Sequence, residues 1–156
     1  AAWLLQQVDS STWRGDLERR TQQYGYRYNY ARSGSKIQTD VPSIESSLFA
    51  PFVEYMNPIF KQISGVDIQQ MIVNEYLPKQ KIGPHVDSPQ FGPVVMTLTL
   101  GTSAPFVMKR DGQNFTLHPR NGDLLTLSGE ARYKWTHETS SFCEGRRVSL
   151  TFRSLR

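Results

Sequence analysis

Residues 94–127 read VVMTLTLGTSAPFVMKRDGQNFTLHPRNGDLLTL, a series of short apolar runs separated by turn residues. The runs are rich in Val, Leu, Thr and Phe, several of which are favoured in β-strands. RDGQN (residues 110–114) stands between two of the runs and is typical of a β-hairpin turn. The stretch therefore predicts consecutive antiparallel strands.

The same pattern continues on both sides of this stretch. MIVNEYL (71–77) precedes it, and YKWTHET (133–139) and RRVSLTFRSL (146–155) follow it. Seven or eight strands at this spacing predict a sandwich or jelly roll. No long helical pattern interrupts them, which argues against a parallel α/β sheet.

The first part of the chain is less regular. VPSIESSLFAPFVEYMNPIF (41–60) has apolar residues at helical spacing. These residues are Ile44, Leu48, Phe52, Met56 and Ile59. We expect one broken helix on a sheet, capped by Ser43 and kinked or ended at Pro51 and Pro58. The predicted fold is mainly β with flanking helices (α+β), as a single domain over residues 1–156. About residues 1–68 would form N-terminal helices and a substrate-recognition segment, and about 69–156 a jelly-roll core.

The composition is that of a globular protein, with 38% apolar and 21% charged residues. No run approaches the roughly 18 apolar residues of a membrane span, and the first residues lack the features of a signal peptide. A single cysteine, Cys143, allows no internal disulfide and fits a reducing compartment. We therefore expect a cytoplasmic or nuclear protein without a membrane segment, and a monomer.

The positive charge is concentrated in one segment. Net charge is +4 and the pI about 9.3, which favours polyanionic partners such as nucleic acid. RRTQQYGYRYNYARSGSK (19–36) carries five cations and no acid, with a tyrosine at every second position from Tyr24 to Tyr30. Period two predicts a strand with aromatic residues on one face. Either the segment binds phosphates and stacks on bases, or it is an ordinary edge strand packed through its tyrosines.

A histidine and an aspartate stand two residues apart in IGPHVDS (82–88). On a strand, His85 and Asp87 would project from the same face. Inside a jelly roll this pair needs a cation, and a second histidine would complete the 2-His-1-carboxylate triad of non-haem Fe(II) oxygenases. His118, beside a turn, and His137, within a late strand, are the two candidates for that histidine.

The last strand supplies two further candidates. In RVSLTFR (147–153), even spacing places Arg147 and Arg153 on one face with Ser149 and Thr151. If that face looks into the jelly roll, the arginines need anions, and a dicarboxylate that also chelates iron would supply them. The alternative is a solvent-exposed strand face.

Together these motifs resemble the AlkB family of Fe(II)- and 2-oxoglutarate-dependent dioxygenases, whose pattern is HxD…H…RxNxTxR. The resemblance runs from about Arg19 to Arg156. It includes the N-x-Y of VNEYLP (73–78) and the block GEARYKWTH (129–137). Ser149 departs from the usual asparagine. The AlkB-like domain associated with a tRNA methyltransferase in animals also has serine there, with a similar RYxWTH block, and is the branch that this sequence most resembles.

The resemblance implies a double-stranded β-helix that uses Fe(II), 2-oxoglutarate and O2. Iron would be bound by His85, Asp87 and His137. The 2-oxoglutarate would be bound by Asn74, Tyr76, Arg147, Ser149 and Arg153. Candidate substrate contacts are Arg19, Arg20, Tyr24 and Tyr26. Arg147 would pair with the distal carboxylate, and Arg153 would lie near the chelating end.

The implied reaction is hydroxylation of an alkyl group on a nucleic-acid base, with oxidative demethylation of N-alkylated DNA or RNA bases favoured. One alternative is a tRNA hydroxylase that acts on a modified wobble uridine. Another is an AlkB-like nucleic-acid-binding module without turnover, against which the intact triad argues. The implied partner is single-stranded DNA or RNA, or tRNA.

Overall fold

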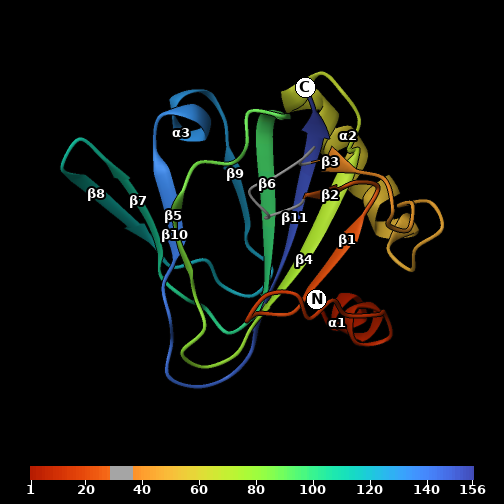
Figure 1. Ribbon diagram of the computed structural model, residues 1–156, viewed down its shortest axis with the longest axis horizontal. Coiled ribbons are helices and arrows are strands. Elements are labelled where there is room, and N and C mark those ends of the chain that lie inside the picture. The colour runs from red at the N-terminus through yellow and green to blue at the C-terminus, as the bar shows by residue number, and fades with distance from the viewer. Residues whose placement is uncertain (29–36) are drawn as a thin grey trace.

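The computed structural model describes residues 1–28 and 37–156, apart from the side chain of Tyr28, and contains two antiparallel sheets that face each other (Figure 1). The larger sheet has the order β1 (Thr21–Tyr24), β4 (Gln70–Tyr76), β11 (Arg147–Leu155), β6 (Phe91–Gly101) and β9 (Leu124–Leu127). The smaller sheet has the order β5 (Ile82–His85), β10 (Thr136–Thr139), β7 (Phe106–Arg110) and β8 (Gln113–Leu117). The predicted mainly β, jelly-roll architecture is confirmed.

Helices cover the outer face of the larger sheet. They are α1 (Ala2–Asp9) and α2 (Ala50–Ser64), at the right of Figure 1. A one-turn helix, α3 (Gly129–Tyr133), precedes β10, and β2 (Arg27–Tyr28) pairs with β3 (Ile37–Gln38) in a short ribbon. Within the described ranges, none of the helices is long and apolar enough to span a membrane.

Strand β11 forms part of the core with one face and part of an internal pocket with the other. Val148, Leu150 and Phe152 are at most 1% exposed and belong to the main hydrophobic core beneath the helices. The alternate residues, from Arg147 to Arg153, line the pocket between the sheets. Because successive strand side chains point to opposite faces, one nine-residue strand supplies both.

Helix α2 differs from the prediction at both boundaries. The broken helix expected over 41–60 is a continuous helix over Ala50–Ser64. Pro51 occupies the first turn, where its missing N–H is not needed. Pro58 lies inside the helix without ending it. Ser43 caps a preceding turn instead of the helix, accepting a 3.1 Å hydrogen bond from the Ser46 amide.

The buried face of α2 is also rotated from the predicted one. Val53, Met56 and Phe60 are at most 6% exposed and pack on the sheet, whereas Leu48 and Ile59 are exposed. The packing of this apolar face explains why the helix tolerates an internal proline, since tertiary contacts outweigh intrinsic propensity.

The predicted tyrosine-lined strand is interrupted. Strand β1 ends at Tyr24, and Gly25 turns the chain with φ = 80° before β2 begins. A Cβ on Gly25 would lie 2.2 Å from the Gln69 carbonyl oxygen, so the turn requires glycine. Tyr30 lies outside the described residues. Of the tyrosines whose side chains the structure describes, Tyr24 lies in β1 and Tyr26 in the turn after it, so these two do not share one continuous strand.

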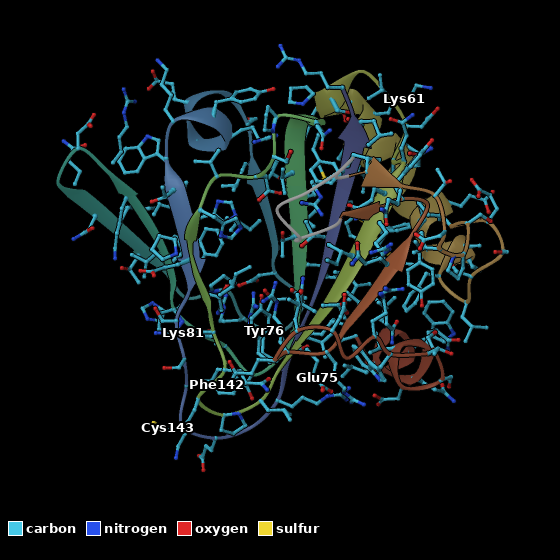
Figure 2. All side chains as sticks on the ribbon, viewed as in Figure 1. Lys61, Glu75, Tyr76, Lys81, Phe142 and Cys143 are labelled. Atoms are coloured by element: carbon cyan, nitrogen blue, oxygen red, sulfur yellow. The ribbon has the colours of Figure 1, made fainter. Side chains whose placement is uncertain are left out.

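Two loops meet at the lower end of the larger sheet, beyond Tyr76 (Figure 2). The Lys79 amide donates a 3.1 Å hydrogen bond to the Phe142 carbonyl and joins the loop after β4 to the loop before β11. Cys143 is exposed on the second of these loops. The loops therefore connect the two sheets at the end where Tyr76 is paired with the start of β11.

Candidate active site

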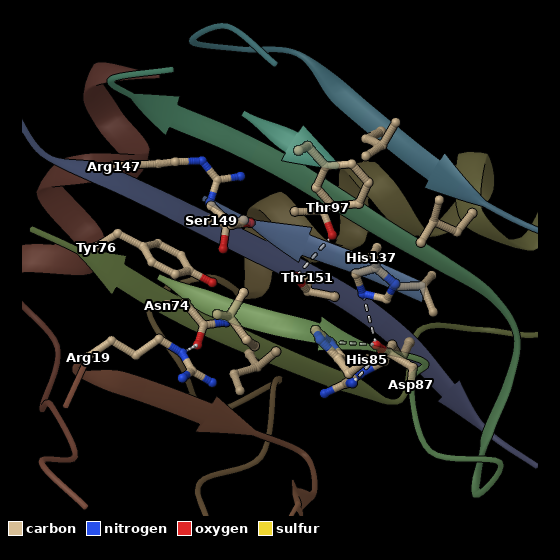
Figure 3. Close-up of a pocket in the computed structure, with 18 residues that line it drawn as sticks. Arg19, Asn74, Tyr76, His85, Asp87, Thr97, His137, Arg147, Ser149 and Thr151 are labelled. Atoms are coloured by element: carbon tan, nitrogen blue, oxygen red, sulfur yellow. Dashed lines mark hydrogen bonds and ion pairs between the residues drawn. The ribbon is translucent and has the colours of Figure 1, made fainter. Parts of the chain in front are cut away.

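Two histidines and an aspartate converge between the sheets. His137 on β10 is the register partner of His85 at the end of β5, and Asp87 follows two residues later. The Nε2 atoms of His85 and His137 lie 3.4 and 3.3 Å from Asp87 Oδ1. Figure 3 shows both rings pointing toward this carboxylate. The possible ligand atoms all lie within 4.8 Å of one another, which fits a 2-His-1-carboxylate metal site.

Each of these side chains is oriented by a second contact. His85 Nδ1 donates to the Gly83 carbonyl at 2.8 Å, which leaves Nε2 for a metal. The His137 ring stacks on Phe106, with centroids 5.5 Å apart. Asp87 Oδ2 accepts a 2.7 Å hydrogen bond from Arg153 Nη1.

The Asp87 carboxylate is held in its ionised form. Burial alone would raise its pKa, but Arg153 and the two histidines outweigh burial and hold the pKa of Asp87 well below its usual range. An anionic oxygen aimed at two imidazole nitrogens suits a divalent cation. His118, the other candidate ligand, lies in the loop after β8 and outside this cluster.

A buried arginine lies in the same pocket, toward the end away from the triad (Figure 3). Arg147 is 2% exposed, contacts Thr99 Oγ1 at 3.3 Å and lies 5.2 Å from the centre of the Tyr76 ring. Burial lowers the pKa of Arg147. In the described part of the chain, no acidic side chain forms an ion pair with it, and its Nε has no hydrogen-bond partner. Because a buried unpaired cation is costly, this position suits an anionic ligand.

The second arginine of β11 stands at the triad end. Arg153 is 7% exposed, donates from Nε to Gln70 Oε1 at 2.8 Å and lies 3.8 Å from the centre of the Phe91 ring. The even spacing correctly predicted that both arginines share one face, and the structure shows that this face is the interior one. The pocket thus has the Arg147 cation at one end and, at the other, the triad with Arg153 paired to Asp87.

Family comparison accounts for this combination. Residues 5–153 match the model of the 2OG-Fe(II) oxygenase superfamily. The chain belongs to this superfamily. It is therefore an oxygenase of the kind that uses Fe(II) and 2-oxoglutarate, and the resemblance noted from its motifs is confirmed at this level. The triad and the buried Arg147 fit these two groups.

Individual relatives are distant. An "Alkylated DNA repair protein ALKBH8 homolog" of Arabidopsis thaliana is 28% identical over 98% of this chain and 54% of its own length. A "tRNA (carboxymethyluridine(34)-5-O)-methyltransferase alkbh8" of Xenopus tropicalis is 29% identical over 86% of this chain and 22% of its own length. The chain thus spans about half, or less, of these relatives.

A solved structure shows the same fold. The 2OG-Fe(II) oxygenase family oxidoreductase of Burkholderia pseudomallei has a TM-score of 0.69 and 18% identity, and the match covers 99% of this chain and 81% of that one. At this identity the likeness establishes the fold alone.

A second pocket of the oxygenase, about 360 Å³ in volume, adjoins the first. The residues that line both pockets are Arg19, Ile82, His85, Asp87 and Arg153. Leu17, Pro84 and Val86 add apolar walls to the outer one. Its volume lies within the roughly 300–1,000 Å³ of small-molecule sites. His85 and Asp87 therefore stand at the junction of an inner and an outer pocket, and His137 lines the inner one.

The predicted substrate contacts are not all brought to this junction. Arg19 lines both pockets and donates to Asn74 Oδ1 at 2.9 Å. Its neighbour Arg20 instead binds Glu75 at 2.8 Å. Tyr24 is 6% exposed and packs on Phe49 in the helix-side core.

Tyr26 is half-buried and lines neither pocket. In the described part of the segment, Arg27 forms an ion pair with Asp40 at 2.9 Å. The cations of this segment are thus partly neutralised by acids that lie outside it in the sequence.

Sequence reasoning assigned no role to several residues of the oxygenase site. Gln70 and Phe91 hold Arg153, and Thr99 contacts Arg147. The period-two pattern could have indicated Gln70 and Thr99, because both share the inner face of their strands. Arg132, within GEARYKWTH, is 1% exposed and donates a hydrogen bond to the backbone carbonyl of Asp87. Its position five residues before His137 in the sequence could have indicated a role near the site.

Proposed function

We propose that this oxygenase hydroxylates an alkyl group on a nucleic-acid base, with oxidative demethylation of N-alkylated DNA or RNA bases as the favoured reaction. The observation that carries the proposal is the position of the triad between an inner pocket with an unpaired buried cation and an outer, partly apolar pocket. Similarity to an alkylated DNA repair protein homolog supports a nucleic-acid substrate.

In this proposal His85, Asp87 and His137 hold Fe(II). When bound, Fe(II) supplies the oxidation of an unactivated C–H bond by O2, coupled to decarboxylation of 2-oxoglutarate to succinate. The chain keeps Asp87 ionised through Arg153 and directs Nε2 of His85 by the Gly83 carbonyl. Both contacts fix the donor atoms before any ligand arrives.

Arg147 takes the distal carboxylate of 2-oxoglutarate. Its free Nε and the neighbouring Nη offer the forked donors that a carboxylate accepts. Asn74, Tyr76 and Ser149 line the same pocket and give polar contacts along the cosubstrate. Arg153, beside Asp87, lies at the chelating end. Arg147 and Arg153 are at most 7% exposed, and this burial strengthens their attraction to a carboxylate.

The outer pocket receives the base. A base must leave its stack to reach this depth, and Leu17, Pro84 and Val86 would contact its faces. Arg19, at the edge shared by both pockets, offers donors to an exocyclic oxygen or a phosphate. Hydroxylation of a carbon attached to a base nitrogen gives an unstable product that releases an aldehyde and the repaired base. Arg20, Tyr24 and Tyr26 are not included in this binding site.

A second candidate is hydroxylation of a uridine side chain in tRNA. Ser149 at the position where the AlkB pattern has asparagine, and the likeness to a tRNA methyltransferase, favour it. There the hydroxylated carbon is bonded to a ring carbon, so the alcohol persists. A cytoplasmic or nuclear monomer would suit either substrate.

One assay distinguishes these possibilities. The protein with Fe(II), 2-oxoglutarate and O2 is given N-methylated single-stranded DNA or RNA, or tRNA, with Asp87→Asn as the inactive control. Formaldehyde release supports demethylation. A tRNA uridine that gains one oxygen without formaldehyde supports the second candidate. If succinate forms but no nucleic acid stimulates its formation, a nucleic-acid substrate is rejected. If no succinate forms under any condition, only the alternative of a binding module without turnover remains.

A further inference from the structure

Arg132 of α3 makes an unusual set of contacts for a residue outside the pocket. It is 1% exposed, and its guanidinium donates four hydrogen bonds to backbone carbonyls. Nε donates to Gly92 at 3.0 Å and Nη1 to Asp87 at 3.0 Å. Nη2 donates to Ser88 at 2.9 Å and to Phe91 at 3.2 Å. All four acceptors lie within six residues of chain.

That stretch, residues 87–92, begins with a proposed metal ligand and forms part of the outer pocket. Asp87, Ser88 and Phe91 line the pocket. Residues 86–90 belong to no strand. Within the loop, the Phe91 amide donates to the Ser88 carbonyl and the Gln90 amide to Ser88 Oγ. The four hydrogen bonds from Arg132 therefore outnumber these two internal ones.

The loop is also held through its side chains. The Phe91 ring lies 3.8 Å from Arg153 Cζ, and Arg153 in turn holds Asp87 Oδ2 at 2.7 Å. Asp87 is thus fixed at its carbonyl by Arg132 and at its carboxylate by Arg153. Arg132 also stands five positions before His137 in the sequence. One short segment therefore carries one metal ligand and restrains another.

We propose that Arg132 is a positioning residue that sets the place of Asp87 and of the outer-pocket loop relative to His137. The inference rests on the proposed metal site. Burying a guanidinium is costly unless its donors are satisfied, and a methionine would fill the same space without that cost. Arg132 orients the Asp87 carboxylate and holds the wall of the outer pocket at a constant distance from His137. The substrate is then positioned for oxidation, so that 2-oxoglutarate turnover stays coupled to substrate oxidation.

The test compares Arg132→Lys and Arg132→Met with Arg110→Met, which removes a half-buried arginine that pairs with Glu130 of α3. Three quantities are measured on the full chain: Co²⁺ affinity, the hydrogen-exchange rates of individual amides, and the ratio of oxidised substrate to succinate. We expect Arg132→Met to weaken Co²⁺ binding by about 10- to 100-fold, with a smaller effect in Arg132→Lys. Amides of residues 88–92 should exchange at least about ten-fold faster while those of β4 and β11 do not change. The ratio should fall, and Arg110→Met should match the unmodified protein.

The positioning role would be overturned if amide hydrogens exchanged faster throughout both sheets. It would also be overturned if both Arg132 variants kept the Co²⁺ affinity and the loop exchange rates of the unmodified protein. If Arg132→Met does not fold, the comparison rests on Arg132→Lys, because lysine keeps the positive charge but lacks the forked donors of the guanidinium. Failure of the underlying metal site is recognised separately, since the unmodified protein would then not bind Co²⁺ although loop exchange would still respond to Arg132.

Discussion

Replacing Arg147 by methionine should separate cosubstrate binding from stability. The side chain is buried, and none of the described acidic side chains forms an ion pair with it. A hydrogen bond to a charged group contributes about 1.5–3 kcal/mol. At about 1.4 kcal/mol per factor of ten, Arg147→Met should raise the KM and the anaerobic Kd for 2-oxoglutarate by about 10- to 150-fold. The KM for nucleic acid should change much less.

The same variant should be no less stable than the original protein when no ligand is bound. A buried charge replaced by an apolar side chain of similar volume is often neutral or stabilising. The substitution removes one 3.3 Å hydrogen bond to Thr99 and the packing of the guanidinium on the Tyr76 ring. The Tm of unliganded Arg147→Met should therefore equal or exceed that of the original protein. Added 2-oxoglutarate should stabilise the variant less.

The neighbouring arginine is the matched control. Arg146 pairs with Glu75 and Asp9 at 2.8 and 2.7 Å on the helix side of the sheet. Arg146→Met should lower Tm and leave the KM for 2-oxoglutarate unchanged. Equal KM values in the two variants, or unchanged 2-oxoglutarate binding in Arg147→Met, would refute the reasoning that the buried cation awaits a carboxylate.

Three further predictions concern the metal ligands, a buried carboxylate outside the site and the two neighbouring arginines before β1. Asp87→Asn should abolish Co²⁺ binding and succinate formation, whereas His118→Ala should leave both near the original level; equal effects in a metal titration would contradict the ligand assignment. Glu75→Gln should lower the free energy of unfolding at neutral pH by about 1–3 kcal/mol. Burial opposes ionisation of Glu75, but hydrogen bonds from two arginines outweigh it and lower its pKa. Its stabilisation is therefore complete above the ordinary pKa, near 4.5, and is lost as the pH falls through the lowered folded-state pKa. The free energy of unfolding of Glu75→Gln should therefore fall less as the pH is lowered than that of the original protein. An equal pH dependence in both proteins would exclude this role of Glu75. Arg19→Ala should weaken nucleic-acid binding and reduce the slope of log affinity against log salt concentration by about 0.7–0.9. Arg20→Ala should lower Tm without changing that slope. If the slope instead changed in Arg20→Ala and not in Arg19→Ala, Arg19 would not be the phosphate contact.

Alternation along the strands was predictable from sequence because it is a local property. Side chains two residues apart share a face whatever the rest of the chain does. This periodicity correctly paired Arg147 with Arg153 and predicted the mainly β architecture. The HxD spacing and the family motifs also led to His85, Asp87 and His137 without any tertiary information.

Tertiary structure alone decided what each face meets. Arg19 and Arg20 are equivalent by composition, yet Arg19 reaches the pockets and Arg20 binds Glu75. They precede β1 outside any strand, so no strand periodicity predicts their directions. Tyr24 entered the core because α2 covers that face of the sheet. The buried contacts of Arg132 join residues 40 to 45 positions apart. Such contacts depend on how the sheets and loops pack, and no periodicity within a short window contains that information.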